Sequence, residues 1–176
     1  MAASAVQRIK AAIRDVPDFP KPGILFKDIM PMLQQPELFR AVVDTFAKRH
    51  AKRKPDVVVG IDARGFIFAG AVAYKLGAGF VAVRKKGKLP FKTIDQTYDL
   101  EYGSETLSMH VDAIPRGARV LIVDDVLATG GTARAAADLV KKLGGKVIEC
   151  DFLIELTFLP GRKRLGKLPV FSAIPV

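Results

Sequence analysis

Two adjacent carboxylates followed by a glycine-rich loop are the residues of this chain best suited to chemistry. Asp124 and Asp125 stand shortly before a loop formed by Ala128, Thr129, Gly130, Gly131 and Thr132. The glycines lack the Cβ atoms that would keep a ligand off the backbone, and a helix that starts after them has N–H groups without partners inside the helix. The loop is therefore suited to bind a phosphate, with the two threonine hydroxyls as further donors.

The carboxylates make this anion site more specific. A phosphate site would avoid further negative charge, so Asp124 and Asp125 suit another part of the same ligand, such as ribose hydroxyls or a hydrated Mg²⁺ ion. We therefore predict a sugar-phosphate site. The alternative is an ordinary strand-to-helix turn that the aspartates only cap.

The apolar pattern around this loop predicts the elements that hold it in place. Residues 120–123 are apolar and mostly β-branched, which is typical of a strand buried on both faces, and the alanine-rich residues 133–143 predict the next helix. Similar patterns predict strands at 57–61, 80–83, 146–156 and 170–174 and helices at 4–16, 36–49 and 66–76. Because strands and helices alternate, we predict one α/β domain over residues 1–176, with a mostly parallel central sheet flanked by helices.

Three further segments complete the expected architecture. Residues 23–29 are a short strand or turn that carries an aromatic side chain, and residues 161–166 are a short basic helix or turn. The polar residues 89–103 are followed by a second strand-like stretch at 105–111, which predicts a two-stranded ribbon over about 89–111. Such a ribbon is suited to act as a flexible lid.

The composition suits a globular domain that buries a sizeable core. The chain has 176 residues, of which 49% are hydrophobic, and a mean hydropathy of +0.20. Its longest apolar runs are too short to cross a bilayer, and residues 1–10 lack the apolar core of a signal peptide. We therefore expect a cytoplasmic protein without a membrane segment.

Cysteine and histidine are scarce. Cys150 is the only cysteine, which excludes an intrachain disulfide and fits a reducing compartment. Its apolar neighbours predict a buried strand residue rather than a nucleophile. His50 and His110 stand alone and are unlike a metal pair, and we expect His50 to be solvated because it lies in a basic stretch.

Positive charge dominates and is concentrated in three clusters, at 48–54, 84–88 and 162–164. The 28 Lys and Arg residues against 18 Asp and Glu residues give a net charge of +10, which attracts anions. The middle cluster follows a predicted buried strand, at the edge where open parallel sheets place ligands. For the other two clusters we favour solvated faces over nucleic-acid binding, because no aromatic residues are interleaved with them.

Residues 120–132 resemble the phosphoribosyl pyrophosphate (PRPP) motif of the type I phosphoribosyltransferase family. Further blocks resemble the adenine-specific members of that family in the same order, over nearly the whole chain: 17–20, 22–29, 60–66, 83–90, 98–103 and 154–156. The resemblance implies the family's fold, with a small hood formed by residues 17–29 and the surroundings of residue 156. It also implies a homodimer, Mg²⁺ as cofactor, and transfer of the phosphoribosyl group of PRPP to adenine, which forms AMP and pyrophosphate.

The resemblance assigns four residues to adenine. In this family an aromatic side chain stacks on one face of the base, here Phe26, and Leu156 would cover the other face. Backbone groups at Leu25 and Lys27 would bond the edge that identifies adenine. Family members that use 6-oxopurines carry an acid at the place of Ala128, so its absence argues against hypoxanthine and guanine.

The same resemblance distributes the groups of PRPP. The loop 128–132 takes the 5′-phosphate, while Asp124 and Asp125 hold the ribose hydroxyls and stabilise the positive charge that departing pyrophosphate leaves on the sugar. Mg²⁺ would be held mainly through PRPP and water. A turn with an expected cis peptide bond between its first two residues, together with nearby cations, takes the pyrophosphate: Asp62, Ala63, Arg64, Arg84 and Lys88.

Two ribbon residues also belong to the site by resemblance. Glu101 would approach the base and ribose when the lid closes and would handle the purine proton, and Tyr102 lies beside it. The alternative for Glu101 is a salt-bridged carboxylate on the ribbon. A rival for the whole chain is a non-enzymatic, PRPP-responsive regulator that binds RNA, but the presence of Phe26, Arg64 and Glu101 favours the enzyme.

Overall fold

The computed structural model describes residues 4–99 and 103–176, and the chain divides into two compact units between Thr45 and Phe46. A capping box between Ser4 and Gln7 starts the first helix. The first unit contains α1 (Ala5–Ala12), β1 (Arg14–Val16), β2 (Phe26–Asp28), α2 (Met30–Leu33) and most of α3 (Pro36–His50). The strand or turn predicted at 23–29 is thus present as β2, and the helix predicted at 36–49 as α3.

The helix predicted at 4–16 was too long. Its last three residues leave the helix and pair as β1 with β2 in antiparallel register. Two ion pairs, Arg14 with Asp28 and Lys27 with Asp15, cross this small sheet at 2.7 Å each. The pairing with β2 outweighs the helical spacing of the sequence, because strand formation depends on cross-strand neighbours more than on local preference.

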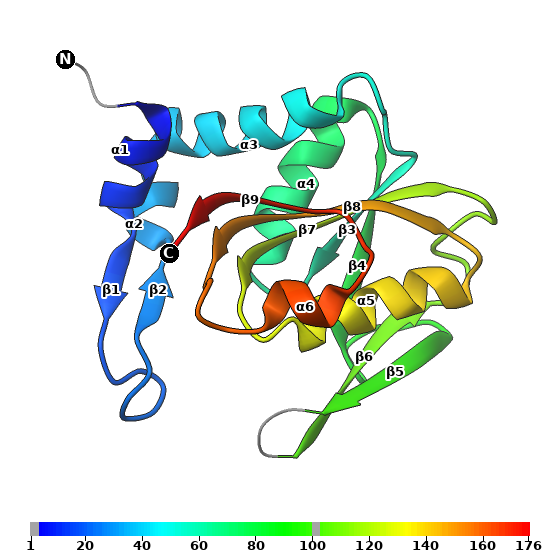
Figure 1. Cartoon of the computed structure of the whole chain (residues 1–176). Helices are drawn as coiled ribbons and strands as arrows, with labels where there is room; N and C mark the ends of the chain where they lie inside the picture. Colours follow the sequence, from blue (N-terminus) through cyan, green and yellow to red (C-terminus); the bar gives the residue numbers. More distant parts are fainter. Residues whose placement is uncertain (1–3, 100–102) are drawn as a thin grey trace. The chain divides into compact units, whose positions relative to one another are not determined.

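The second unit is built on a seven-stranded sheet with the order β5-β6-β4-β3-β7-β8-β9 (Figure 1). Neighbours among β4, β3, β7, β8 and β9 are parallel, whereas β6 is antiparallel to both β4 and β5. The elements are β3 (Val57–Ile61), α4 (Gly65–Leu76), β4 (Gly79–Lys85), β5 (Thr93–Asp99), β6 (Ser104–His110), β7 (Arg119–Leu127), α5 (Gly131–Lys142), β8 (Lys146–Glu155), α6 (Gly161–Leu165) and β9 (Val170–Pro175). The predicted α/β fold with a mostly parallel sheet is confirmed.

Helices cover both faces of this sheet. Because side chains alternate along a strand, Val59 and Ile61 of β3 face the core that includes the alanines of α5, whereas Gly60 faces α4. A Cβ atom on Gly60 would lie 2.7 Å from the Cβ atom of Ala69, so α4 packs directly on the β3 backbone. Within the described ranges, no helix has the length and apolar composition needed to cross a membrane.

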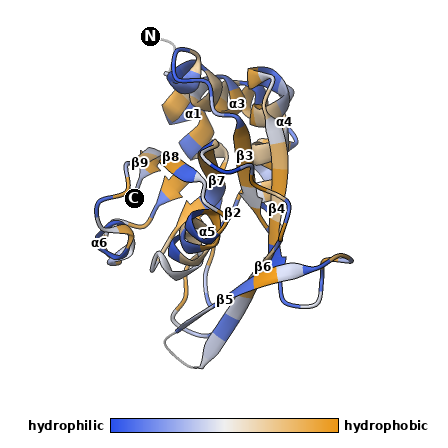
Figure 2. Ribbon diagram, turned by 90° about the vertical axis from the view of Figure 1, so that its right-hand side faces the viewer, coloured by the Kyte–Doolittle hydropathy of each residue, from blue (hydrophilic) through white to orange (hydrophobic). Residues whose placement is uncertain are grey.

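The predicted ribbon is present as β5 and β6, paired from Thr93 with His110 to Asp99 with Ser104. Figure 2 shows blue and white segments along β5, in contrast to the orange of β4. The ribbon is nevertheless anchored, because Leu107 and Met109 of β6 are buried in the core. Whether its far end acts as a lid stays a prediction.

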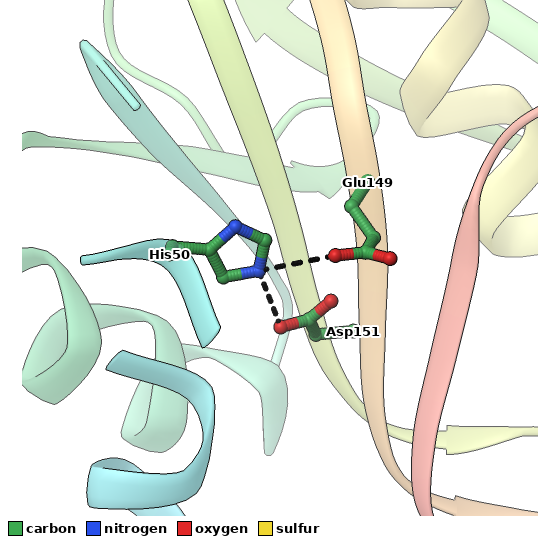
Figure 3. A group of neighbouring side chains, drawn as sticks. All are labelled: His50, Glu149 and Asp151. Carbon is green, nitrogen blue, oxygen red and sulfur yellow. Dashed lines mark hydrogen bonds and ion pairs between the residues drawn. The ribbon is translucent and has the colours of Figure 1, made fainter. Parts of the chain in front are cut away.

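His50 is not solvated, contrary to the prediction. Its side chain is fully buried, and its Nε2 atom lies 2.8 Å from Asp151 Oδ2 and 3.5 Å from Glu149 Oε2 on β8 (Figure 3). Arg49 donates to both oxygens of Glu149, at 2.8 and 2.6 Å. The last turn of α3 therefore lies against β8, where Arg49 and His50 face the two carboxylates.

The sequence could not show this contact, because its partners are about 100 residues apart. Burial raises the pKa of Asp151, and the hydrogen bond from His50 opposes that shift. Cys150, between the two carboxylates, is buried as predicted, and burial raises the pKa of its thiol to about 12. Such a thiol is protonated at neutral pH and is not a nucleophile.

Candidate active site

The glycine-rich loop lies where β7 ends and α5 begins. Gly130 stands before α5 with a φ of 80°, a left-handed conformation that favours glycine. A Cβ atom on Gly130 would lie 2.5 Å from the carbonyl oxygen of Gly161, the first residue of α6. Figure 1 shows α6 beside this end of α5. The loop is thus packed backbone against backbone. The first N–H groups of α5 have no partners inside the helix, which suits them to bind an anion.

Both predicted aspartates belong to β7, which is longer than the predicted strand at 120–123. Asp125 is 5% exposed and its N–H donates to Asp124 Oδ1 at 2.9 Å. A Cβ atom on Gly65, the first residue of α4, would lie 2.6 Å from the same oxygen, so a larger residue there would displace this carboxylate. The side chains of both aspartates therefore lie against the start of α4 rather than free at the surface.

The electrostatics of this pair suit a cationic ligand. Burial raises the pKa of Asp124 well above its usual range, and the charge of Asp125 adds to that shift. Burial also raises the pKa of Asp125, although the charge of Arg64 opposes the shift. Two carboxylates held this close are ionised together at lower cost when a positive charge lies beside them, such as a cationic sugar or a metal ion.

The residues predicted for pyrophosphate come together at the ends of β3 and β4, which are parallel neighbours. The Asp62–Ala63 peptide bond is cis, as the resemblance implied. Arg84 Nε lies 2.8 Å from Asp62 Oδ2, and Arg84 Nη1 donates to the carbonyl oxygen of Lys88 at 3.0 Å. The turn also leads into Arg64 at the N-cap of α4, so the predicted set lies at one edge of the sheet.

The side chains of the basic run 84–88 turn in two directions. Lys85 forms an ion pair with Glu105 of β6, and Lys86 lies 3.0 Å from Asp95 of β5. These two lysines are turned toward the ribbon, whereas Arg84 is turned toward the Asp62 turn. Three of the four cations that the sequence grouped together are thus divided between the Asp62 turn and the ribbon.

Of the four residues predicted for adenine, three lie in the first unit and one in the second. Phe26, on β2 of the first unit, makes an edge-to-face contact with Phe19 at 5.1 Å between ring centroids, and Leu25 before it is 48% exposed. Lys27 pairs with an aspartate across the small sheet. Leu156, in the second unit, donates its N–H to the carbonyl oxygen of Leu127 at 2.9 Å. The roles in base binding assigned to these residues stay predictions.

Glu101 and Tyr102 lie outside the described residues. Two neighbours that the sequence reasoning missed are visible instead. The hydroxyl of Tyr98 lies 3.1 Å from Thr132 Oγ1 and donates to Glu105 Oε2 at 3.0 Å. The sequence showed a polar ribbon with alternating tyrosines, and Tyr98 begins the block 98–103 that resembles the family. Neither feature reveals a contact 34 residues away.

Glu155 was also missed as a positioning residue. Arg162 donates to both of its oxygens, at 2.9 and 2.5 Å, and Ser172 Oγ donates to Oε2 at 2.5 Å. The bond from Arg162 lowers the pKa of Glu155. This carboxylate therefore holds α6 in place, and the first residue of α6, Gly161, packs against the loop 128–132.

A model of the phosphoribosyl transferase domain family matches residues 31–167. Among curated proteins, the adenine phosphoribosyltransferase of Solibacter usitatus is 59% identical over 94% of this chain and 96% of its own length. That of Methylacidiphilum infernorum is 53% identical over 97% and 96%. Among solved structures, adenine phosphoribosyltransferase from Rhodothermus marinus is 53% identical, with a TM-score of 0.95 over 99% of this chain and all of that one.

A fourth relative was solved with ligands. Adenine phosphoribosyltransferase from Saccharomyces cerevisiae, complexed with adenine and D-2,5-dideoxy-2,5-imino-altritol 1,6-bisphosphate, is 44% identical with a TM-score of 0.92, over 98% of this chain and 99% of that one. The fold and the family match define a phosphoribosyltransferase, and the chain belongs to the phosphoribosyl transferase domain family. Its reaction is transfer of the phosphoribosyl group of PRPP to adenine, which forms AMP and pyrophosphate. Each relative named here is an adenine phosphoribosyltransferase, and none of these comparisons supports the RNA-binding alternative.

Proposed function

We propose that this reaction takes place over the two aspartates at the end of β7. The loop 128–132 binds the 5′-phosphate of PRPP, and the Asp62–Ala63 turn, Arg64, Arg84 and Lys88 bind its pyrophosphate. The observation that carries this proposal is the position of the buried carboxylates. Asp125 contacts Arg64 at 2.7 Å on one side, and β7 continues into the phosphate loop on the other. The ribose of PRPP, which joins the two phosphate groups, belongs between them.

The chemistry follows from where charge develops. Breaking the bond to pyrophosphate leaves positive charge on the ribose, as in glycoside hydrolysis. Asp124 and Asp125 hold the ribose hydroxyls and stabilise that charge, because fixed charges in a buried site need no reorganisation during the reaction. Arg64 and Arg84 bind the leaving pyrophosphate with planar guanidinium groups. Glu101 handles the purine proton when the ribbon closes over the base.

Base recognition is assigned to the two segments that the sequence singled out. Phe26 stacks on adenine, Leu156 covers the opposite face, and the backbone at Leu25 and Lys27 bonds the edge of the ring. Support comes from the exposure of this region, since Leu25 is 48% exposed and Phe26 is outside the buried core. Apolar side chains left accessible in this way gain by covering a flat base.

Mg²⁺ fits the donor set of this site. Asp124 and Asp125 offer carboxylate oxygens, the ligands that Mg²⁺ prefers, and the raised pKa of each carboxyl indicates a place where a cation would be stabilising. Bound Mg²⁺ would neutralise charge on pyrophosphate. The two carboxylates would hold it mainly through water and PRPP.

A homodimer is the assembly we propose. Tyr74 on α4 is 91% exposed, and Ile67 on the same helix and Phe80 on β4 are 38% and 44% exposed. Large apolar groups exposed on two elements that contact each other favour burial against another protein surface. The resemblance implies that this surface belongs to a second copy of the chain. We assign the protein to the cytoplasm and assign it no nucleic-acid partner.

Pyrophosphate release tests the reaction, with PRPP and adenine, hypoxanthine, guanine or orotate as acceptor. Adenine alone should support rapid turnover, and equal turnover with hypoxanthine would overturn the base assignment. A crystal structure with AMP tests the site, because the phosphate should lie on the N–H groups of the loop 128–132. Finding that loop empty with the phosphate bound elsewhere would overturn the site while leaving the reaction intact.

A further inference from the structure

A chain of polar contacts connects the basic run of β4 to the phosphate loop. Lys85 pairs with Glu105 on β6, Glu105 accepts a hydrogen bond from Tyr98 on β5, and the Tyr98 hydroxyl lies 3.1 Å from Thr132 Oγ1 in α5. Four elements are thereby joined. The ribbon thus contacts the loop 128–132 at Tyr98.

The contact between Tyr98 and the loop is held from several sides. A Cβ atom on Gly131 would lie 2.9 Å from Tyr98 Cδ2, so the ring lies directly on the backbone of the loop. Arg164 Nη2 donates to the carbonyl oxygen of Asp99 at 3.1 Å, one residue further along β5. Lys142 Nζ donates to the carbonyl oxygen of Asp95 at 2.8 Å, three residues before Tyr98. The Tyr98 hydroxyl is therefore fixed opposite Thr132.

Counting hydrogens gives the direction of each bond. A tyrosine hydroxyl has one hydrogen, and an ionised carboxylate only accepts. Lys85 lowers the pKa of Glu105 through its hydrogen bond, so Glu105 is ionised and accepts the hydrogen bond that the Tyr98 hydroxyl donates. The Tyr98 oxygen must then accept the hydrogen of Thr132. Without ligand, the donors run from Thr132 to Tyr98 to Glu105.

A bound phosphate reverses this order. Phosphate oxygens accept hydrogen bonds, so the single hydrogen of Thr132 turns to the phosphate. The Thr132 oxygen can then accept from Tyr98, which leaves Glu105 with Lys85 alone. Bonds in such a chain strengthen one another, because each donor polarises the next.

We propose that Tyr98 is a positioning residue that acts on PRPP through Thr132. When the 5′-phosphate binds, the hydrogen bond that Tyr98 donates moves from Glu105 to Thr132. The inference rests on the proposed role of Thr132 in phosphate binding. It couples occupancy of the loop to the strand that leads into residues 100–102.

Steady-state kinetics and a double-mutant cycle test this role. Tyr98→Phe removes the hydroxyl and keeps the ring, and should raise the KM for PRPP and the Kd for ribose 5-phosphate about three- to tenfold, the value of one hydrogen bond. The KM for adenine should not change. In a Thr132→Val background, Tyr98→Phe should have less than about a twofold effect, because coupled residues are not additive. Thr97→Val is the matched control, since its hydroxyl pairs with that of Thr106 across the ribbon at 2.9 Å.

A second variant keeps the test informative if Tyr98→Phe folds poorly. Glu105→Leu removes the competing acceptor and leaves the Tyr98 hydrogen free for Thr132, so ribose 5-phosphate should bind about two- to threefold more tightly, part of one hydrogen bond. A residue that only supports the fold would instead weaken binding. The gain should vanish when Tyr98→Phe is added, which separates it from any effect of the freed Lys85 charge.

The outcomes distinguish the two proposals. If Thr132→Val leaves ribose 5-phosphate binding unchanged, the phosphate assignment itself is wrong. If Thr132→Val weakens binding but Tyr98→Phe has no effect, or has its full effect in both backgrounds, only the inference about Tyr98 is overturned.

Discussion

Arg64 Nε lies 2.7 Å from Asp125 Oδ2, which joins a residue assigned to pyrophosphate to one assigned to the ribose. The family resemblance assigned these residues to separate roles. In the structure the guanidinium offsets part of the cost of burying the carboxylate, since a nearby opposite charge favours the ionised form. A ligand that contacts either group therefore alters the environment of the other.

Asp125→Asn should lower kcat by about 100-fold or more while changing stability little, because the carboxylate acts on charge that develops during the reaction. The amide has nearly the same shape, and losing a buried charge removes a desolvation cost. Turnover and thermal unfolding should be measured together. Asp138→Asn is a suitable control, since that carboxylate forms an exposed pair with Arg134 at 3.1 Å and should affect neither quantity. Parallel losses of activity and stability in Asp125→Asn would contradict this role.

Gly130→Ala should destabilise the protein and weaken PRPP binding, because the new Cβ atom would meet the Gly161 backbone. Gly117→Ala separates the two causes, since Gly117 has a similar φ of 82° with no atom within 4 Å of an added Cβ. The control should cost about 1–2 kcal/mol from its left-handed conformation alone. Gly130→Ala should cost about 1–3 kcal/mol more, from overpacking. Equal free energies of unfolding for the two variants would show that the contact with α6 is unimportant.

Glu155→Gln should lower stability by about 1–2 kcal/mol at pH 7, because it removes charge-assisted bonds from Arg162 and Ser172. The folded-state pKa of Glu155 is lowered, so its contribution to stability is complete above the unfolded pKa and is lost as pH falls through the folded pKa. Denaturant unfolding of both proteins between pH 7 and pH 3 checks this sign. The difference should shrink on acidification, and a constant difference would argue against an ionic origin.

His50→Leu should destabilise the protein by about 3–5 kcal/mol, because it leaves the charge of Asp151 buried without its partner at 2.8 Å. The double variant His50→Leu/Asp151→Leu should recover most of that loss, since apolar side chains can replace a buried pair at little cost. Unfolding free energies decide this point. Turnover of the folded double variant should match that of the wild type, and a selective loss of activity would show that the cluster has a catalytic role.

The end of the ribbon should become protected when PRPP binds. Leu107 and Met109 anchor the base of β6, so we expect the change near 98–105 rather than along the whole hairpin. Glu101→Gln should retain PRPP affinity while lowering turnover by about 100-fold or more, as for a positioned proton-transfer group. Hydrogen exchange tests the protection of the ribbon, and single-turnover kinetics test the role of Glu101. Full protection without ligand would disprove the first prediction, and wild-type turnover of Glu101→Gln would disprove the second.

The sequence alone determined the local parts of this protein. Hydrophobic periodicity identified most strands and helices, because each element shows its buried face within a few turns or pleats. The segment 120–132 was sufficient to predict the phosphate site, since its strand, carboxylates, glycines and helix start are consecutive in the chain. The cis peptide bond at Asp62 and the identity of the reaction came from the resemblance of whole motifs to a family.

Only the tertiary structure decided which distant side chains meet. His50 was expected in water, yet the end of α3 places it against Asp151 on β8. Tyr98 was expected only as a residue of the ribbon, yet the folded hairpin brings its hydroxyl within hydrogen-bonding distance of the Thr132 hydroxyl. Periodicity determines which face of an element is buried, but the element opposite that face and the register of the contact depend on packing of the whole chain. Contacts between residues 34 and 101 positions apart therefore emerged only from the fold.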